Sequence, residues 1–121
     1  MSNIIQKKIN SELKFVYSDN NTISVIFQNN DLLLGVVGEF NCNLKELEKI
    51  TGTNIYSRGN SILIKSEQKK NELVKNSIKF LADQFIINGS IEKKDIISSV
   101  NKFMINEKIK NSEKNIEYII K

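Results

Sequence analysis

The chain has 121 residues, of which 40% are hydrophobic and 26% are charged, and this suits one globular domain with a modest core. It has no histidine and one cysteine, Cys42. This composition excludes histidine-dependent catalytic triads, multi-cysteine zinc sites and an internal disulfide framework. The formal net charge of +4 mildly favours a polyanionic partner.

The N-terminal residues, MSNIIQKKINSELKF, lack the apolar core of a secretory signal. No run approaches the 18 apolar residues of a transmembrane helix. A single cysteine suits a reducing compartment, so we expect a cytoplasmic protein without a membrane partner. Residues 1–21 are polar with scattered apolar positions, and we expect a loose arm that could hold a short helix or strand.

The first regular elements follow this arm. Residues 22–28 alternate between apolar and polar side chains, which predicts a strand. Asn29, Asn30 and Asp31 then supply N-cap residues for a short buried helix through LLLGVV, which ends at Gly38.

A second helix is predicted over residues 43–51. Asn43 with Glu46 three residues later fits a capping box, and Gly52 is a suitable C-terminal cap. The apolar stripe at helical spacing comprises Leu44, Leu47 and Ile50.

A hairpin and two further helices are predicted beyond Gly52. Residues 53–57 and 61–65 have strand patterns, and Arg58, Gly59 and Asn60 form a tight structural turn between them. Helical spacing predicts helices over residues 67–87, ended by Gly89, and over residues 92–104. Their inward residues are predicted to be Val74, Ile78, Leu81 and Phe85 in the first, and Ile96, Val100 and either Phe103 or Met104 in the second.

The predicted order is β–α–α–β–β–α plus one helix, an α+β sandwich with a three-stranded antiparallel sheet and helices on one face. We divide the chain into an N-terminal arm (1–21), this domain with its added helix (22–104), and a C-terminal extension or linker (105–121). The order, with a glycine turn between two short helices, resembles the type I KH fold. That resemblance implies single-stranded nucleic acid binding through a G-x-x-G loop.

A narrower resemblance is to the N-terminal region of PhoH-like proteins and covers about residues 22–104. It lies in LLLGVVGEFNCNLKELEKITGTNIYSRGNSILI and in the Gly89-Ser90-Ile91 segment. In that family a P-loop ATPase domain follows. This chain has no Gly-Lys pair and therefore no G-x-x-x-x-G-K-[ST] motif. ATP and Mg²⁺ are expected only if an ATPase domain follows, and the chain itself is expected to have no cofactor, no metal site and no enzymatic activity.

The KH resemblance places Gly38-Glu39-Phe40-Asn41 at the G-x-x-G position. Glycine lets a chain approach phosphates closely, and helix-start amides offer donors. Two departures are the Glu39 carboxylate, which would repel a phosphate by about 1 kcal/mol in a solvated setting, and Asn41 in place of the second glycine, which tolerates left-handed geometry. The residues expected to contact nucleic acid are Gly38, Glu39, Phe40, Asn41, Asn43, Lys45, Lys49 and Arg58.

Each of these predictions has a plainer alternative. The Gly38–Asn41 loop could be a structural turn that docks a protein domain, and Lys45 and Lys49 could lie on a solvated helix face. Arg58 could pair with a phosphate or an acidic partner, or be merely solvated. Phe40 and Tyr56 are candidates for base stacking, although Tyr56 equally suits strand packing.

Two functions therefore remain open. The first is a non-catalytic module that binds single-stranded RNA, alongside an ATPase domain where one is present. The second is a protein-interaction or self-association domain without RNA affinity, which would use a strand edge or the apolar face of the 92–104 helix. The chain could also be a fragment, the remnant of a degraded gene or a stand-alone derivative.

Overall fold

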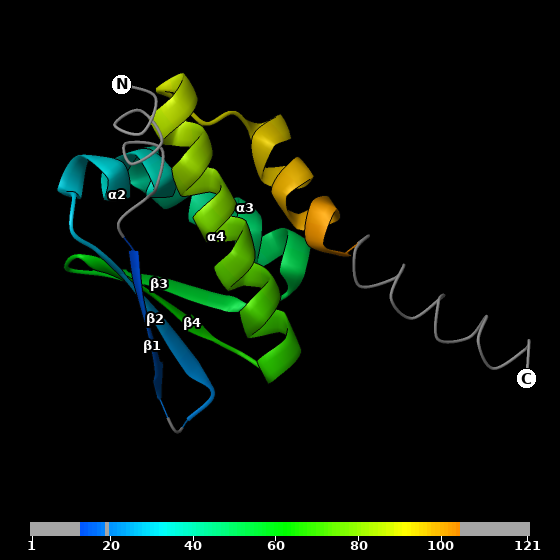
Figure 1. Ribbon diagram of the computed structural model, residues 1–121. Coiled ribbons are helices and arrows are strands. Elements are labelled where there is room, and N and C mark those ends of the chain that lie inside the picture. Colours follow the sequence, from blue (N-terminus) through cyan, green and yellow to red (C-terminus); the bar gives the residue numbers. More distant parts are fainter. Residues whose placement is uncertain (1–12, 19, 105–121) are drawn as a thin grey trace, which may run out of the picture.

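Four antiparallel strands form the sheet of this protein, in the order β1-β2-β4-β3. The computed structural model describes residues 13–18 and 20–104 (Figure 1). The strands are β1 (Leu13–Ser18), β2 (Thr22–Phe27), β3 (Asn54–Arg58) and β4 (Ser61–Lys65).

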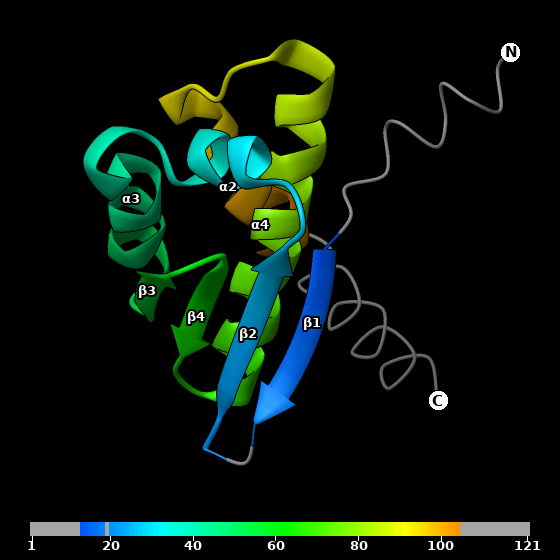
Figure 2. The same cartoon turned by 90° about the vertical axis from the view of Figure 1, so that its left-hand side faces the viewer.

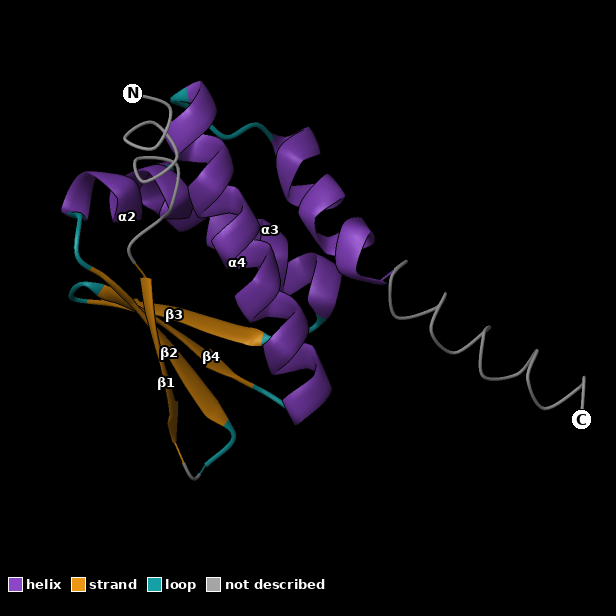
Figure 3. Ribbon diagram, in the orientation of Figure 1, coloured by secondary structure: helices purple, strands orange, loops and turns teal. Residues whose placement is uncertain are grey.

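The helices lie together on one face of this sheet (Figure 3). They are α2 (Asn30–Val37), α3 (Cys42–Thr51), α4 (Gln68–Asn88) and a helical segment over residues 93–104. A short 3₁₀ turn, Glu39–Asn41, joins α2 to α3. The α+β class and the single helical layer are therefore confirmed, and from β2 to α4 the elements follow the predicted order.

The predicted three-stranded sheet is wrong, because residues 13–18 add a fourth strand at the edge beside β2 (Figure 2). Leu13 and Phe15 pack against the core from this strand, although both lie in the stretch that we expected to be a loose arm. The remainder of that arm, residues 1–12, and the predicted extension over residues 105–121 lie outside the described residues.

The hydrophobic core lies between the sheet and the helices. Side chains alternate along each strand, so one set of strand residues faces the helical layer. The buried strand residues are Ile23, Val25, Phe27, Ile55, Ile62 and Ile64. The buried helical residues are Leu32, Leu33, Val36, Val37, Leu44, Leu47, Val74, Ile78, Leu81, Ala82, Ile96 and Val100.

The opposite face of the sheet is not covered by any described helix, and we refer to it as the open face. The strand register places twelve side chains there, none of them buried. They are Lys14, Val16, Ser18, Thr22, Ser24, Ile26, Asn54, Tyr56, Arg58, Ser61, Leu63 and Lys65.

Most predicted helix ends are confirmed. The Asn29 side chain caps α2, because its Oδ1 accepts hydrogen bonds from the backbone N–H groups of Asp31 (2.8 Å) and Leu32 (3.2 Å). Helix α2 ends at Gly38, and Gly52 and Gly89 adopt left-handed conformations after α3 and α4.

The predicted capping box at α3 is wrong. Helix α3 begins at Cys42 with Asn41 as its N-cap, so Asn43 lies inside the first turn. The Asn43 side chain instead donates to the Val36 carbonyl of α2 at 3.1 Å. Glu46 pairs with Lys93 at 3.9 Å, which links α3 to the 93–104 segment.

Two predictions about inward side chains also change. Ile50 is 38% exposed, so the buried stripe of α3 consists of Leu44 and Leu47 alone. Phe85 is only partly buried. Of the two alternatives for the last helical segment, Phe103 is the inward one, because it is partly buried whereas Met104 is 40% exposed.

Strand β1 is attached to α4 by a polar cluster. The Lys75 ammonium lies 2.8 Å from Glu72 Oε2 and donates to the Tyr17 hydroxyl at 2.9 Å. Its Nζ also lies 5.3 Å from the centroid of the Phe15 ring. Burial lowers the pKa of Lys75, but the hydrogen bonds to Glu72 and Tyr17 and the charge of Glu72 outweigh that effect and raise the pKa above its ordinary value.

A buried amide holds two loops at the start of α4. Asn71 Nδ2 donates to the carbonyl oxygens of Asn21 (2.6 Å) and Ser66 (2.9 Å), so it connects the β1–β2 turn to the β4–α4 loop. Its Oδ1 is buried without a hydrogen-bond partner among the described residues.

Candidate nucleic-acid interface

The turn between α2 and α3 has an unusual backbone. Gly38 has φ of 77°, and a Cβ there would lie 2.8 Å from the Asn43 side chain and 2.9 Å from the Cys42 sulfur. Position 38 therefore requires glycine both for its backbone conformation and for lack of space. Phe40 (φ 53°) and Asn41 (φ 59°) follow, also in the left-handed region.

Phe40 is 90% exposed at this turn. A left-handed conformation costs an L-residue other than glycine roughly 1–2 kcal/mol, and it is uncommon for a bulky side chain. Phe40 therefore has a strained backbone conformation, and its ring is almost entirely exposed to solvent. Strained residues concentrate at functional sites, so this ring is a candidate contact for a ligand.

The start of α3 lies directly after Phe40. Its N-cap, Asn41, makes no side-chain capping hydrogen bond, so no first-turn N–H group of α3 donates to that side chain. Such amides and the helix dipole favour an anion. The Glu39 carboxylate, however, is exposed in the same turn.

The predicted residues of α3 differ in their roles. Lys45 and Lys49 are exposed one helical turn apart, and no ion pair joins either of them to another described residue. Asn43 is half-buried with its amide donated to Val36, so it stabilises the α2–α3 junction instead of facing solvent.

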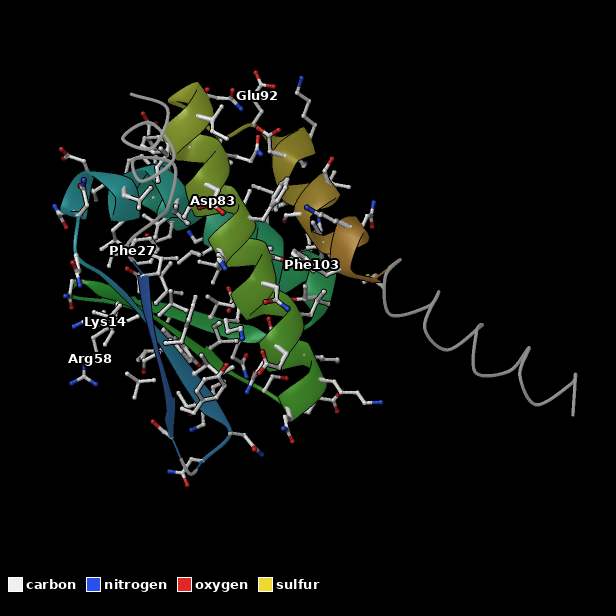
Figure 4. All side chains as sticks on the ribbon, viewed as in Figure 1. Lys14, Phe27, Arg58, Asp83, Glu92 and Phe103 are labelled. Atoms are coloured by element: carbon white, nitrogen blue, oxygen red, sulfur yellow. The ribbon has the colours of Figure 1, made fainter. Side chains whose placement is uncertain are left out.

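Arg58 does not join this group. It pairs with Ser61 in the β3–β4 register and points from the open face, away from the helical layer that contains Lys45 and Lys49 (Figure 4). The predicted site is therefore divided between the α2–α3 turn and the opposite side of the sheet.

The turn between β3 and β4 consists of Gly59 and Asn60, because Arg58, which we predicted to be part of it, is the last residue of β3. Gly59 has φ of 60° and Asn60 does not adopt a positive φ, which is the φ pattern of a type II′ hairpin turn. The Asn60 carbonyl accepts from Phe27 N–H at 2.9 Å, and its Nδ2 donates to the Phe27 carbonyl at 3.3 Å. These bonds fix the hairpin to the end of β2.

Sequence reasoning did not identify two cations that share the open face with Arg58, namely Lys14 and Lys65. The signal was present, because both lysines alternate with apolar residues that face the core. Lys14 was missed because residues 13–18 were not assigned to a strand.

Neither a metal-binding cluster nor a membrane-spanning helix is found among residues 13–18 and 20–104. No group of three or more cysteine, aspartate or glutamate side chains there could hold a metal ion. No helix in the same part of the chain has both the length and the apolar content needed to cross a membrane.

Comparison of the chain with protein-family models, with curated proteins and with solved structures found no match. The resemblance to PhoH-like proteins and to the KH fold therefore remains a prediction from sequence.

Proposed function

We propose that this protein is a non-catalytic, KH-like module that binds single-stranded RNA at the α2–α3 turn. The observation that supports the proposal most is the pairing of a strained, 90% exposed Phe40 with the start of α3, where Asn41 provides no side-chain cap. An aromatic ring next to helix-start amides offers a surface for a base and donors for its phosphate.

In this proposal each part of the turn has a separate task. Gly38 lets the backbone approach the strand, the amides of the first turn of α3 bind a phosphate oxygen, and Phe40 stacks on a base. Lys45 and Lys49 attract the backbone along the exposed side of α3. Glu39 weakens the site by about 1 kcal/mol through repulsion in solvent, so modest affinity is expected.

The PhoH-like resemblance extends this proposal to a longer protein. Where a P-loop ATPase domain follows the module, the module would deliver RNA to that domain or regulate it. These 121 residues contain no ATP-binding motif of the P-loop type, so the RNA contact is the activity to test on this chain.

Fluorescence anisotropy of a labelled oligouridylate tests the proposal. We expect the Lys45→Glu/Lys49→Glu variant to lose at least tenfold in affinity at low salt, and Phe40→Ala to lose affinity without any change in net charge. The Lys69→Glu/Lys79→Glu variant is the matched control, because both lysines are exposed on α4 and the charge change is the same.

Two results would reject the proposal. One is no binding by the unmodified protein at low salt. The other is an equal loss in the variant and the control, because that would indicate attraction by net charge alone.

Assembly through protein contacts is the second candidate function. The exposed Glu39 carboxylate favours it, since a protein surface can supply a cation where a phosphate cannot. The 93–104 segment offers less than expected, because Ile96 and Val100 are buried in the core, which leaves Ile97 and Met104 as its exposed large apolar side chains. The edge strands β1 and β3 remain. Concentration-dependent self-association in light scattering, without RNA affinity, would support this alternative.

A further inference from the structure

The open face of the sheet has a composition that the core does not explain. Its twelve side chains include three cations, and none of the twelve is aspartate or glutamate. Figure 4 shows two of the cations, Lys14 and Arg58, extending from the sheet on the side away from α4. Among the described residues no ion pair involves Lys14, Arg58 or Lys65.

Tyr56 lies among these cations with its ring available. It is 51% exposed and stands opposite Leu63 in the β3–β4 register. Arg58 and Asn54 flank it on the same face of β3, each two residues and therefore about 7 Å along the strand. Lys65 stands opposite Asn54. The tyrosine ring therefore has a basic residue toward each end of the strand.

Apolar and small polar side chains complete the surface. Val16, Ile26 and Leu63 lie between the cations, together with serine and threonine side chains that can donate and accept hydrogen bonds. Such a surface can contact the faces and edges of bases, while cations at its periphery meet phosphates.

The charge pattern selects among possible occupants. A second copy of the chain docked by the same face would place cations against cations, which is repulsive in a two-fold contact. An apolar partner would leave three charges without a partner. A single-stranded nucleic acid fits both features, because its phosphates can pair with the three cations and its bases can stack on the exposed tyrosine ring.

We infer that the open face is a second RNA-binding surface, separate from the α2–α3 turn, on which a base of single-stranded RNA stacks against Tyr56 while Lys14, Arg58 and Lys65 contact its phosphates. This inference does not depend on binding at the α2–α3 turn, because the two surfaces lie on opposite layers of the fold. If both surfaces bind, an RNA can contact both sides of one molecule.

The salt dependence of oligouridylate binding tests the charges. We compare the full chain with Lys14→Gln/Arg58→Gln/Lys65→Gln and with a control of equal charge, Lys69→Gln/Lys70→Gln/Lys79→Gln, whose lysines are exposed on α4. The open-face variant is expected to lose at least tenfold in affinity. Its slope of log K against log salt should be smaller by about 2, the value for three phosphate contacts on a single strand. Equal behaviour of variant and control would overturn the inference.

The tyrosine is tested by its own fluorescence, which is visible because the chain has no tryptophan and three tyrosines. Unlabelled oligouridylate should quench the emission of the unmodified protein and have little effect on that of Tyr56→Phe, in which stacking persists. Tyr56→Ala should bind roughly five- to 150-fold more weakly, the equivalent of about 1–3 kcal/mol for one base–aromatic stack. Equal quenching in Tyr56→Phe, or unchanged affinity in Tyr56→Ala, would overturn the inference.

Two controls distinguish the possible failures. If Lys45→Glu/Lys49→Glu abolishes binding and the open-face variant does not weaken it, the turn is the site and the inference fails while the proposed function stands. The opposite result retains the open face and rejects the turn.

Vesicles that contain anionic phospholipid provide the second control. If the protein binds them as tightly as RNA, and Tyr56→Ala binds them equally well, the open face is a general anion surface and the inference is overturned. Circular dichroism checks that each variant folds, which we expect because none of the substituted side chains is buried.

Discussion

The same four strands form both faces of the sheet, but one face packs against the helices and the other is exposed. On the covered face the central strands contribute isoleucine, valine and phenylalanine side chains that are almost entirely buried. On the open face the four strands present lysine, arginine, asparagine, serine, threonine and tyrosine side chains, with a few apolar residues between them. Packing accounts for the first face. The second is free of that constraint, so its exposed ring and its three cations, which form no ion pair among the described residues, suggest binding.

The largest contrast between the faces is expected at neighbouring positions of β4. Ile64 is fully buried, and Ile64→Ala should reduce the free energy of unfolding by about 2–5 kcal/mol. Leu63 lies on the open face, and Leu63→Ala should reduce it by about 1 kcal/mol or less because less area is buried. Urea denaturation measures both. Equal losses would show that the open face is covered in solution and would contradict this contrast.

The next largest effect is expected at the buried Asn71 side chain, at the start of α4. Asn71→Asp replaces the donor to Asn21 and Ser66 with a carboxylate, and we expect a loss of roughly 2–4 kcal/mol at neutral pH. Burial raises the pKa of such a carboxyl group, and its protonated form can donate again. The loss should therefore shrink as the pH falls. A loss that is independent of pH would show that water reaches this position.

A smaller effect is expected where α2 approaches α4. A Cβ on Gly35 would lie 2.3 Å from the Phe85 ring, so Gly35→Ala must displace that ring. The overpacking should cost about 1–3 kcal/mol, reduced by the gain of about 1 kcal/mol in helix propensity. Thermal denaturation should show partial recovery in Gly35→Ala/Phe85→Leu. An unchanged or greater loss in the double variant would indicate that the ring is not the obstacle.

The smallest effect concerns the cluster that attaches β1 to α4. Lys75→Met removes the ion pair with Glu72 and the bond to Tyr17, and we expect a loss of less than about 1 kcal/mol because the pair is partly solvated. The raised pKa of Lys75 means that its contribution is complete below the unfolded value of about 10.4 and disappears as the pH rises through the folded pKa. Urea denaturation at pH 8 and at pH 11 should therefore show the two proteins converging at the higher pH. A constant difference would indicate that Lys75 acts through packing.

The sequence predicted much of the fold because its local signals agree. Asn29 before an apolar run, and glycines at 38, 52 and 89, placed helix ends correctly. Strand β1 was left unassigned within an arm expected to hold at most a short helix or strand. Leu13, Phe15 and Tyr17 alternate with the residues between them, but only Leu13 and Phe15 pack on the core and neither is fully buried. Where a strand buries little, alternation alone is a weak signal.

The candidate site was less predictable for a geometric reason. The capping box at Asn43 failed because α3 begins at Cys42, which places Asn43 inside the first turn, where its side-chain amide donates to Val36 of α2. The left-handed backbone of Phe40 has no sequence signal, since aromatic residues rarely adopt it. Arg58 was predicted to contact the same nucleic acid as Lys45 and Lys49, whereas strand parity places it on the other side of the sheet.

The position of β1 also determines which part of the sheet should exchange its amide hydrogens first. In the described sheet β1 pairs only with β2, and none of its side chains is fully buried. We therefore expect β1 to detach in a partial opening while the strands that contain Ile23, Ile55 and Ile64 stay paired. That opening leaves the outer backbone groups of β2 unpaired, and an unpaired edge accepts another strand. Hydrogen exchange should show β1 amides exchanging well before those of β4, and any partner that adds a strand beside β2 would have to compete with the protein's own β1.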